Sequence, residues 1–561
     1  MTYDPFPCYP VAGGKISFGS DALAEDLART RPAVVALDGP AALPWERVVG
    51  RLREALVAAG VACQAVDVRG FLAGWDEVRR RTAGSELPGD PVFARLADGS
   101  LADLFDGLPR RVARPDAEVT LAFGPGSALV THERLWYLDI PKRLTLQAVQ
   151  RGQAGNLGQP PGQPGTEQRH LFVDWPLLDR HRDTVVARVD RFVDLTDPEV
   201  PHWLDGGPLR ASLEALSVAP FRTRPAFQPG SWGGQWLRRR LGVQTDAPNL
   251  AWSYELVAPE AGLLLGSSPA VEVPFGMLLA THAEAVMGGP LVQRFGRSFP
   301  VRFDYLDTVD GGDLSVHCHP LPDAMRATFG WPYPQHESYY VMATRPGARI
   351  FLGLRDRVDV DRFRRDAERA ETAGRAFDIG RYVQSFPAAR HRLYLIPAGT
   401  PHGSGEGNVV LEISATPYLY SLRFYDWLRR DLDGSLRPVH VGHAFANVDV
   451  GRRGAAARAL IQQPRPLRTG SGFTEQLIGA LPELFFEVRR LQFADQADDD
   501  SAGRFHVLNL VAGEQVLLET AAGHSHPLAY AETIVVPAAV GPYRLRRLRG
   551  PACQVVKAVV P

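Results

Sequence analysis

The stretch Leu314-Ser-Val-His-Cys-His-Pro320 decides the architecture expected for this chain, because it sets His317 and His319 two residues apart. Side chains alternate across a β-strand, so in a strand both imidazole rings point to the same face. With Glu337 and His402 further along, the pair offers three nitrogens and one carboxylate, a set that suits Zn²⁺ first and then Fe, Mn, Co or Ni. The alternative for the pair alone is two hydrogen-bonded strand histidines, since histidine is also an ordinary half-buried residue.

Length and composition limit the class of protein. A chain of 561 residues exceeds the size of one hydrophobic core, which predicts two or three domains. The net charge of −1 gives no basic stripe for nucleic acid and no charge excess for a membrane surface, and no apolar run is long enough to span a bilayer. The first residues lack a signal-peptide pattern and the four cysteines are scattered, so we expect a reduced, cytoplasmic protein. The oligomeric state is not indicated.

Residues 1–215 are predicted to form an α/β domain with a parallel sheet. Short apolar runs alternate with helical patterns such as that of residues 45–59. The runs are 33–37, 61–66, 119–123 and 135–139. Their layout resembles that of nucleoside or uridine kinases, but the turn at 38–45 lacks the glycine-rich nest, lysine and hydroxyl of a phosphate-binding loop. We therefore expect a degenerate, kinase-like domain without a P-loop.

The remainder of the chain reads as short strands and turns. A change of composition places a domain boundary near residue 216, and helical patches interrupt the strands at 277–286 and 361–373. Many short strands with Gly and Pro between them indicate a sandwich or small barrel. Two such regions, 216–480 and 481–561, predict an all-β part made of tandem barrels with helical insertions.

Several motifs in this part resemble, in the same order, those of class I mannose-6-phosphate isomerases of the cupin superfamily. They are Ser231-Trp-Gly-Gly-Gln235, Arg302-Phe-Asp-Tyr-Leu-Asp-Thr308, the HxH stretch, Pro397-Ala-Gly-Thr-Pro-His402 followed by Leu411-Glu-Ile413, and Leu422-Arg-Phe-Tyr-Asp-Trp-Leu-Arg-Arg-Asp431. The resemblance covers roughly residues 225–445 and implies tandem cupin barrels. It leaves the first 215 residues outside as an additional domain.

The resemblance implies a metal site with His317, His319, Glu337 and His402 as ligands. This chain departs from the family at two positions, since the family usually has Gln at the first ligand and Lys two residues before the glutamate. Here Gln335 takes the place of that Lys and cannot supply its positive charge to a phosphate or an enediolate. Gln335 and His336 are substrate-binding candidates, although His336 faces away from Glu337 if the segment is a strand.

Two further residues are candidates for the chemistry. By the family pattern Glu412 is the base that moves a proton; the alternative is a buried strand glutamate paired with an arginine. Arg423 is the cation, because a guanidinium grips a phosphate or two sugar oxygens; its alternative is a surface salt bridge with Asp426. His524 repeats an HxH spacing with His526, but no matching glutamate and later histidine accompany them, so we expect no second metal site.

Together these patterns predict a metal-dependent aldose–ketose isomerase. The resemblance implies interconversion of mannose-6-phosphate and fructose-6-phosphate, or of a related sugar, through a cis-enediol, with Zn²⁺ or another divalent metal as cofactor. Two alternatives stay open. One is a non-isomerase cupin, either an Fe-dependent oxygenase or a sugar-binding protein, and the other is a two-function protein whose first domain phosphorylates a sugar or nucleoside.

Overall fold

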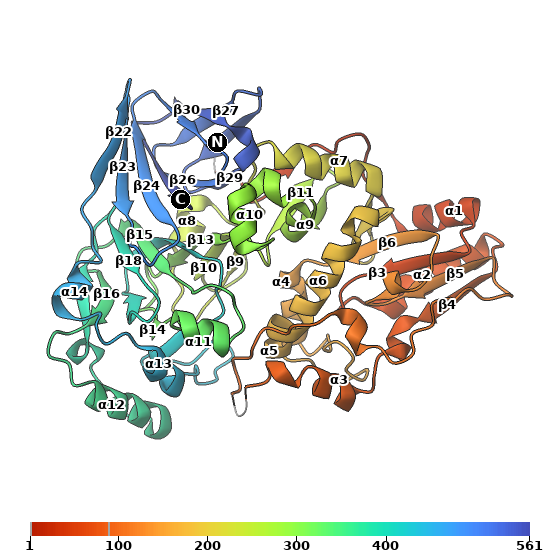
Figure 1. The fold of residues 1–561 in the computed structure, drawn as a ribbon, viewed down its shortest axis with the longest axis horizontal. Coiled ribbons are helices and arrows are strands. Elements are labelled where there is room, and N and C mark those ends of the chain that lie inside the picture. Colours follow the sequence, from red (N-terminus) through yellow and green to blue (C-terminus); the bar gives the residue numbers. More distant parts are fainter. Residues whose placement is uncertain (1–2, 88–89) are drawn as a thin grey trace. The chain divides into compact units, whose positions relative to one another are not determined.

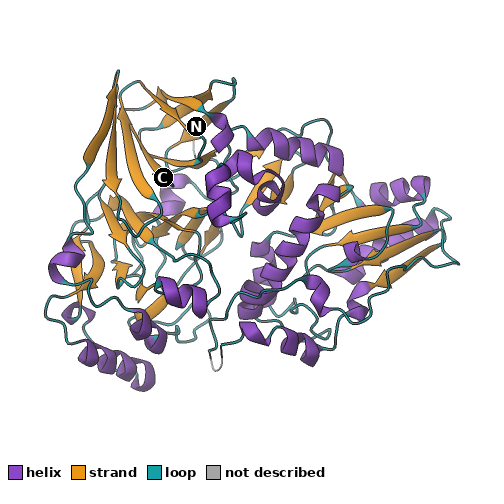
Figure 2. Ribbon diagram, in the orientation of Figure 1, coloured by secondary structure: helices purple, strands orange, loops and turns teal. Residues whose placement is uncertain are grey.

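The computed structural model describes residues 3–87 and 90–561 and divides the chain into two compact units. The α/β unit is formed by residues 7–217 and 259–283, and the β-rich unit by residues 3–6, 218–258 and 284–561. The chain is thus a multidomain, sheet-rich protein with mixed helices and strands (Figures 1 and 2). The units differ from the expected segments because residues 259–283, placed by sequence in the second domain, pack with the first.

The α/β unit is built on a seven-stranded sheet with the order β2-β8-β7-β6-β3-β5-β4. Five consecutive strands, β7, β6, β3, β5 and the edge strand β4, are parallel to one another; β8 pairs antiparallel with β7, and β2 pairs antiparallel with β8. The strands are β2 (Ser17–Phe18), β3 (Val34–Asp38), β4 (Cys63–Asp67), β5 (Val119–Phe123), β6 (Arg134–Asp139), β7 (Arg191–Asp194) and β8 (His202–Asp205). The four apolar runs predicted as strands are thus β3 to β6, because parallel strands with both faces covered are almost continuously apolar.

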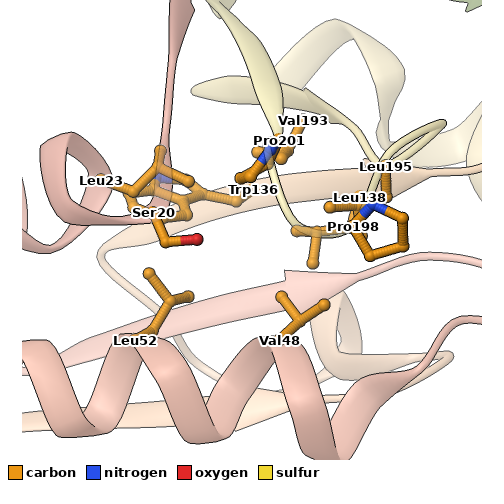
Figure 3. Close-up of a pocket in the computed structure, with 10 residues that line it drawn as sticks. All are labelled: Ser20, Leu23, Val48, Leu52, Trp136, Leu138, Val193, Leu195, Pro198 and Pro201. Carbon is orange, nitrogen blue, oxygen red and sulfur yellow. The ribbon is translucent and has the colours of Figure 1, made fainter.

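Helices connect these strands and cover the sheet (Figure 2). They are α1 (Ser20–Thr30), α2 (Trp45–Ala58), α3 (Trp75–Arg81), α4 (Lys142–Gln150), α5 (Glu167–Arg169), α6 (Trp175–Val185) and α7 (Gly206–Ser217). One core is formed by α1 and α2 against the sheet. A small apolar gap remains where Val48 and Leu52 of α2 face Trp136 and Leu138 of β6 (Figure 3).

A second sheet completes the α/β unit and contains its inserted segment. β1 (Cys8–Tyr9) pairs in parallel with β11 (Gly262–Leu265), which pairs with β12 (Val271–Pro274). The helix α9 (Phe275–Met287) follows, and the division between the units falls within it. Leu263, Leu265, Val271, Val273 and Phe275 are all fully buried, which explains why this segment packs inside a unit from which it is distant in sequence.

The β-rich unit contains four antiparallel sheets. The first two have the strand orders β18-β15-β20-β13-β10-β9 and β17-β16-β19-β14-β21. The strands of the first are β9 (Ala226–Gln228), β10 (Trp252–Leu256), β13 (Val301–Asp307), β15 (Glu337–Thr344), β18 (Leu393–Ile396) and β20 (Asn408–Ala415). Those of the second are β14 (Val316–Cys318), β16 (Arg349–Leu354), β17 (Val383–Pro387), β19 (His402–Ser404) and β21 (Leu422–Tyr425).

The other two sheets are formed by the C-terminal residues and have the orders β22-β23-β24-β31-β26-β29 and β25-β30-β27-β28. Their strands begin at Arg465, ahead of the expected start at residue 481. They are β22 (Arg465–Gly470), β23 (Phe473–Gly479), β24 (Glu487–Phe493), β25 (Gln496–Asp500), β26 (His506–Ala512), β27 (Gln515–Thr520), β28 (Ser525–Ala529), β29 (Thr533–Val536), β30 (Pro542–Arg549) and β31 (Cys553–Val559). An apolar core lies between these two sheets.

Short helices interrupt the strands of the β-rich unit. They are α8 (Trp236–Leu241), α10 (Gly289–Phe295), α11 (Pro322–Ala327), α12 (Val360–Ala373), α13 (Val441–Asn447) and α14 (Gly454–Arg458). The predicted helical patches at 277–286 and 361–373 correspond to α9 and α12. Within the described parts of the chain, no helix combines the length and hydropathy that crossing a membrane requires.

Candidate metal centre

Four buried side chains from the first two sheets of the β-rich unit meet at one point. They are His317, His319, Glu337 and His402, and one potential ligand atom from each lies within 4.8 Å of all the others. His317 and His402 are register partners on the neighbouring strands β14 and β19, so their rings lie on the same face, with centroids 4.2 Å apart. Glu337 begins β15 of the other sheet. The two sheets therefore bring together residues that are up to 85 positions apart.

The expectation that an HxH strand directs both rings to one side is confirmed. The ring centroids of His317 and His319 are 5.3 Å apart, and that of His319 is 5.0 Å from that of His402. Cys318, the residue between, points the other way, and its Sγ lies 3.7 Å from the carbonyl oxygen of Ala444. The thiol is therefore not part of the cluster.

Backbone carbonyls fix the orientation of all three rings. Nδ1 of His317 lies 2.9 Å from the carbonyl oxygen of Ser315. Nδ1 of His319 lies 3.1 Å from that of Tyr420, and Nδ1 of His402 lies 2.9 Å from that of Thr400. A carbonyl only accepts, so Nδ1 carries the hydrogen and Nε2 has a lone pair in the neutral ring. Histidines that bind a metal usually donate their other ring N–H to a carbonyl or carboxylate in this way, which fixes the tautomer and the orientation of the ring.

The lone pairs of two rings face the Glu337 carboxylate. Nε2 of His319 lies 2.8 Å from Oε1, and Nε2 of His402 lies 3.1 Å from Oε2. Lone pairs at such distances repel each other unless a proton or a cation lies between them. The donor set and its hydrogen-bonded support therefore fit a divalent cation bound by imidazoles and a carboxylate.

The pKa values follow from burial and from these neighbours. Burial, together with the nearby His402 and His319, lowers the pKa of His317 well below its ordinary value, and burial also lowers that of His319. Burial alone would raise the pKa of Glu337, but His319 and His402 hold it well below its usual range. An ionised carboxylate and neutral imidazoles are the protonation states that bind a metal.

Beside this cluster lies a buried network of charges, in which Glu412 pairs with an arginine as the alternative for that residue predicted. Arg302 on β13 contacts three carboxyl groups: its Nη2 is 3.0 Å from Oε1 of Glu337 and also contacts Oε1 of Glu412, and its Nε is 3.3 Å from Oδ1 of Asp304. Burial and the nearby Glu337 raise the pKa of Asp304 to about 6 even though Arg302 opposes the shift. Three carboxyl groups thus surround one guanidinium in a buried site, an arrangement that favours a bound cation beside it.

The register of β13, β15 and β20 explains why these groups meet. Asp304 is the partner of Glu412 in one strand pair, and Tyr339 is the partner of Glu412 in the other, so the three side chains share a face. The Tyr339 hydroxyl is buried and has no hydrogen-bond partner among the described residues. The signal for this network in the sequence is the presence of polar residues at alternate positions of otherwise apolar strands. One sequence does not show which strands pair, so it does not show which of these residues meet.

The remaining predicted residues lie at different distances from the cluster. Nε2 of Gln335 donates to Oε1 of Glu337 over 2.9 Å, so the neutral amide contacts the carboxylate directly. His336 is not among the residues brought together, because its Nδ1 accepts from the backbone N–H of Ala398 over 3.0 Å. Burial lowers the pKa of His336 to about 4.

Arg423 is the register partner of His317 on β21, so its side chain leaves the sheet on the same face. Its Nη1 donates to the carbonyl of Pro438 over 3.0 Å. Among the ion pairs of the described residues, Asp426 is paired with Arg437 over 2.8 Å and not with Arg423. Burial and the nearby Arg437 lower the pKa of Arg423 to about 10, so it stays charged at neutral pH.

Comparison with known proteins adds evidence for both parts of the chain. Residues 19–218 match a family model described as a domain of unknown function (DUF8485). The mannose-6-phosphate isomerase of Streptococcus mutans serotype c is 24% identical over 291 residues, which are 50% of this chain and 82% of that protein. Mannose-6-phosphate isomerase ManA of Bacillus subtilis strain 168 is 24% identical over 238 residues, 42% of this chain and 70% of its own length.

Among solved structures, mannose 6-phosphate isomerase from Bacillus subtilis aligns with a TM-score of 0.50 at 20% sequence identity. The alignment covers 61% of this chain and 99% of that protein, which shows a shared fold. The predicted kinase likeness of the first domain stays a prediction. The predicted resemblance is confirmed for the other part, because the relatives found for about 60% of the chain are mannose-6-phosphate isomerases.

Proposed function

We propose that this protein is a metal-dependent aldose–ketose isomerase that interconverts mannose-6-phosphate and fructose-6-phosphate or a closely related sugar phosphate. One observation carries the proposal: three imidazoles and a carboxylate converge within 4.8 Å beside a second buried carboxylate, Glu412. The names of the relatives indicate the substrate, and this chain spans 82% and 70% of their lengths. The ligand set favours Zn²⁺ over the other divalent metals.

The chemistry divides between four ligands and two other residues. His317, His319, Glu337 and His402 would hold the metal, which when bound would polarise the oxygens on C1 and C2 of the sugar. Glu412 accepts the proton from C2 of the aldose and returns it to C1 of the enediol, while the hydroxyl proton on the oxygen of C2 passes to the oxygen of C1, so that the carbonyl moves from C1 to C2. A base of this kind must be ionised, and its contact with Arg302 favours the charged form.

Arg423 is the residue that we propose for binding the phosphate. Its guanidinium lies on the His317 face of the sheet and its Nε is buried with no hydrogen-bond partner among the described residues. A half-buried guanidinium whose side-chain hydrogen bond among the described residues goes to a carbonyl gains from an anionic ligand. Arg302 is less suited to this role, because three carboxyl groups already surround it.

The kinase alternative for the first domain is disfavoured by one contact network. The Asp38 carboxylate at the end of β3 accepts hydrogen bonds from the backbone N–H groups of Gly39, Gly126 and Ala128 and lies 2.8 Å from Nε2 of His181. These backbone donors are the kind that a phosphate would need. An anionic side chain at this position would instead repel a phosphate.

The test is an isomerase assay on metal-loaded protein. Zn²⁺-loaded enzyme is incubated with a panel of aldoses and their 6-phosphates, and ketose formation is followed. We expect turnover of mannose-6-phosphate, its loss in His402→Ala together with the bound metal, and wild-type turnover in His524→Ala, which removes an exposed histidine of the C-terminal sheets. A metal-loaded wild-type protein that binds sugars without forming ketose would instead indicate a non-isomerase cupin.

A further inference from the structure

We infer that Arg302 is a positioning residue for the proton transfer, acting through Glu412 rather than on the substrate. This inference rests on the proposed function. A single nitrogen, Nη2, contacts both Oε1 of Glu412 and Oε1 of Glu337. The proposed base and a proposed metal ligand are therefore held to each other by one guanidinium.

The hydrogen bonds to Glu412 all fall on one oxygen. Oε1 receives Nη2 of Arg302 and the hydroxyl of Ser414, the latter over 2.9 Å. Among the described residues no hydrogen bond is directed to Oε2. Fixing one carboxylate oxygen sets the plane of the group, so Oε2 is the oxygen left to exchange a proton with the substrate.

The guanidinium is itself held rigidly. Arg302 is only 5% exposed, and it is the register partner of Ser414, which places it diagonally beside Glu412 on the neighbouring strand β20. Its Nε lies 3.3 Å from Oδ1 of Asp304, an ion pair without a hydrogen bond among the described residues. Because the planar guanidinium is enclosed by the carboxyl groups of Asp304, Glu337 and Glu412, few alternative rotamers are open to it, and its orientation is passed on to Glu412.

A lysine could not do the same. An ammonium group carries the charge as a point on a flexible chain, so it can neutralise Glu412 without fixing the plane of its carboxylate. Arg302→Lys therefore keeps the positive charge at this position and removes the planar group that fixes the orientation of Glu412. Its effect should appear in the rate of the proton transfer and not in substrate binding.

The experiment is a double-mutant cycle on the metal-loaded, full-length enzyme with mannose-6-phosphate. We expect Arg302→Lys to lower kcat by about 10- to 100-fold, the effect of a misplaced group, with KM within about two-fold of wild type. On a Glu412→Gln background, Arg302→Lys should cause no further loss, because the group that it positions is already gone. In Arg302→Ala, added guanidinium ion should restore part of kcat.

Metal affinity, measured by competition with a chelator, and thermal unfolding of each variant are followed in parallel. They should change little in Arg302→Lys, since the charge beside Glu337 is retained. The inference is overturned if the loss in kcat multiplies with that of Glu412→Gln, if only KM or metal affinity changes, or if kcat is unaffected. Wild-type enzyme that forms no ketose would overturn the proposed function itself, whereas these outcomes leave it standing.

Discussion

His317 is the proposed metal ligand at which this chain differs from the isomerases that its motifs resemble, which usually have glutamine there. In this structure the ring is fixed by the carbonyl of Ser315 and lies 4.2 Å from the ring of His402. Imidazole is a stronger ligand than an amide oxygen for a borderline cation such as Zn²⁺. We therefore expect the difference between histidine and glutamine at position 317 to change the affinity for the metal more than the rate of isomerisation.

For His317→Gln we predict a metal affinity about 10- to 100-fold lower than that of wild type. Turnover at saturating metal should stay within about ten-fold of wild type, because the amide can still occupy the ligand position. Chelator competition measures the first quantity and ketose formation in excess Zn²⁺ the second. His524→Gln, an exposed control, should change neither, and an unchanged affinity in His317→Gln would contradict a role for His317 as ligand.

The ligand residues could be predicted from sequence because their chemistry is specific and their spacing is local or follows a motif. Arg302, Asp304 and Tyr339 could not, although two of them lie in a stretch that carries the resemblance. Their role depends on the pairing of β13, β15 and β20, which brings residues about 110 positions apart into contact. Alternation along the chain predicts that His336 faces away from Glu337, and its Nδ1 accepts from the backbone N–H of Ala398.

At the scale of elements, the positions of the long apolar runs could be predicted from the sequence, but the elements that pack against them could not. The strands β3 to β6 and the helices α2 and α12 occur within a few residues of their expected positions. The segment 259–283 has the same strand-and-turn texture as the chain around it, yet it packs with the α/β unit. Nothing in its local pattern shows which core will bury its apolar side chains.

One ion pair fastens β12 of this segment to α4 of the α/β unit. Nη1 and Nη2 of Arg143 lie 2.5 and 2.7 Å from the two oxygens of Glu272, whose side chain is 5% exposed. We predict that Arg143→Glu destabilises the attachment of β11 and β12 by roughly 3 kcal/mol, because it removes the guanidinium from a buried carboxylate and places a second negative charge beside it. Hydrogen exchange at the amides of β11 and β12 measures the effect.

The charge-reversed double variant, Arg143→Glu with Glu272→Arg, should recover more than half of the loss. Arg29→Glu is the matched control, because Arg29 pairs with Asp26 at the surface with its side chain 74% exposed. Such a pair is worth less than about 1 kcal/mol. Equal effects of the two single substitutions would show that the Arg143–Glu272 pair does not hold the segment.

His506 on β26 makes the C-terminal sheets sensitive to acid. Burial, and next the charge of Lys557, lower its pKa from 6.5 to about 3, and its Nδ1 lies 2.8 Å from the hydroxyl of Tyr543. The folded state thus keeps the ring neutral where the unfolded chain protonates it, so this group costs stability as the pH falls below 6.5. The other charged groups around it are Asp499, Arg489 and Glu475.

Between pH 7 and pH 5 this group should lower the free energy of unfolding by about 2 kcal/mol. His506→Gln removes the titration while keeping a polar side chain. Urea unfolding of wild type and variant at both pH values measures the difference, and the variant should lose about 2 kcal/mol less than wild type over this range. Equal losses would show that His506 is already protonated, or not buried, in the folded state.

At the scale of the whole molecule, the chain passes between its two units more than once. Residues 3–6 belong to the β-rich unit, where the backbone N–H of Asp4 donates to Oε1 of Glu532 over 2.7 Å and the hydroxyl of Tyr3 contacts Glu255. Residues 7–217 then form most of the α/β unit, and residues 259–283 return to it. Composition and length predict several domains but not such an exchange of segments, which depends on long-range packing.

Because of this exchange of segments, a chain cut between the units should stay together. A protease site inserted at Val218, which is 40% exposed just after α7, would divide the protein into two fragments. Each fragment would still hold a segment of the other's unit: the first carries residues 3–6, and the second carries β11, β12 and part of α9.

We predict that the fragments elute together in size-exclusion chromatography under native conditions and separate only in denaturant. Leu263 and Leu265 of β11 and Val271 and Val273 of β12 are fully buried, so their release would cost several kcal/mol. Arg143→Glu in the cut protein should make separation easier at intermediate urea. Fragments that separate freely in native buffer would show instead that each unit is complete without the exchanged segments.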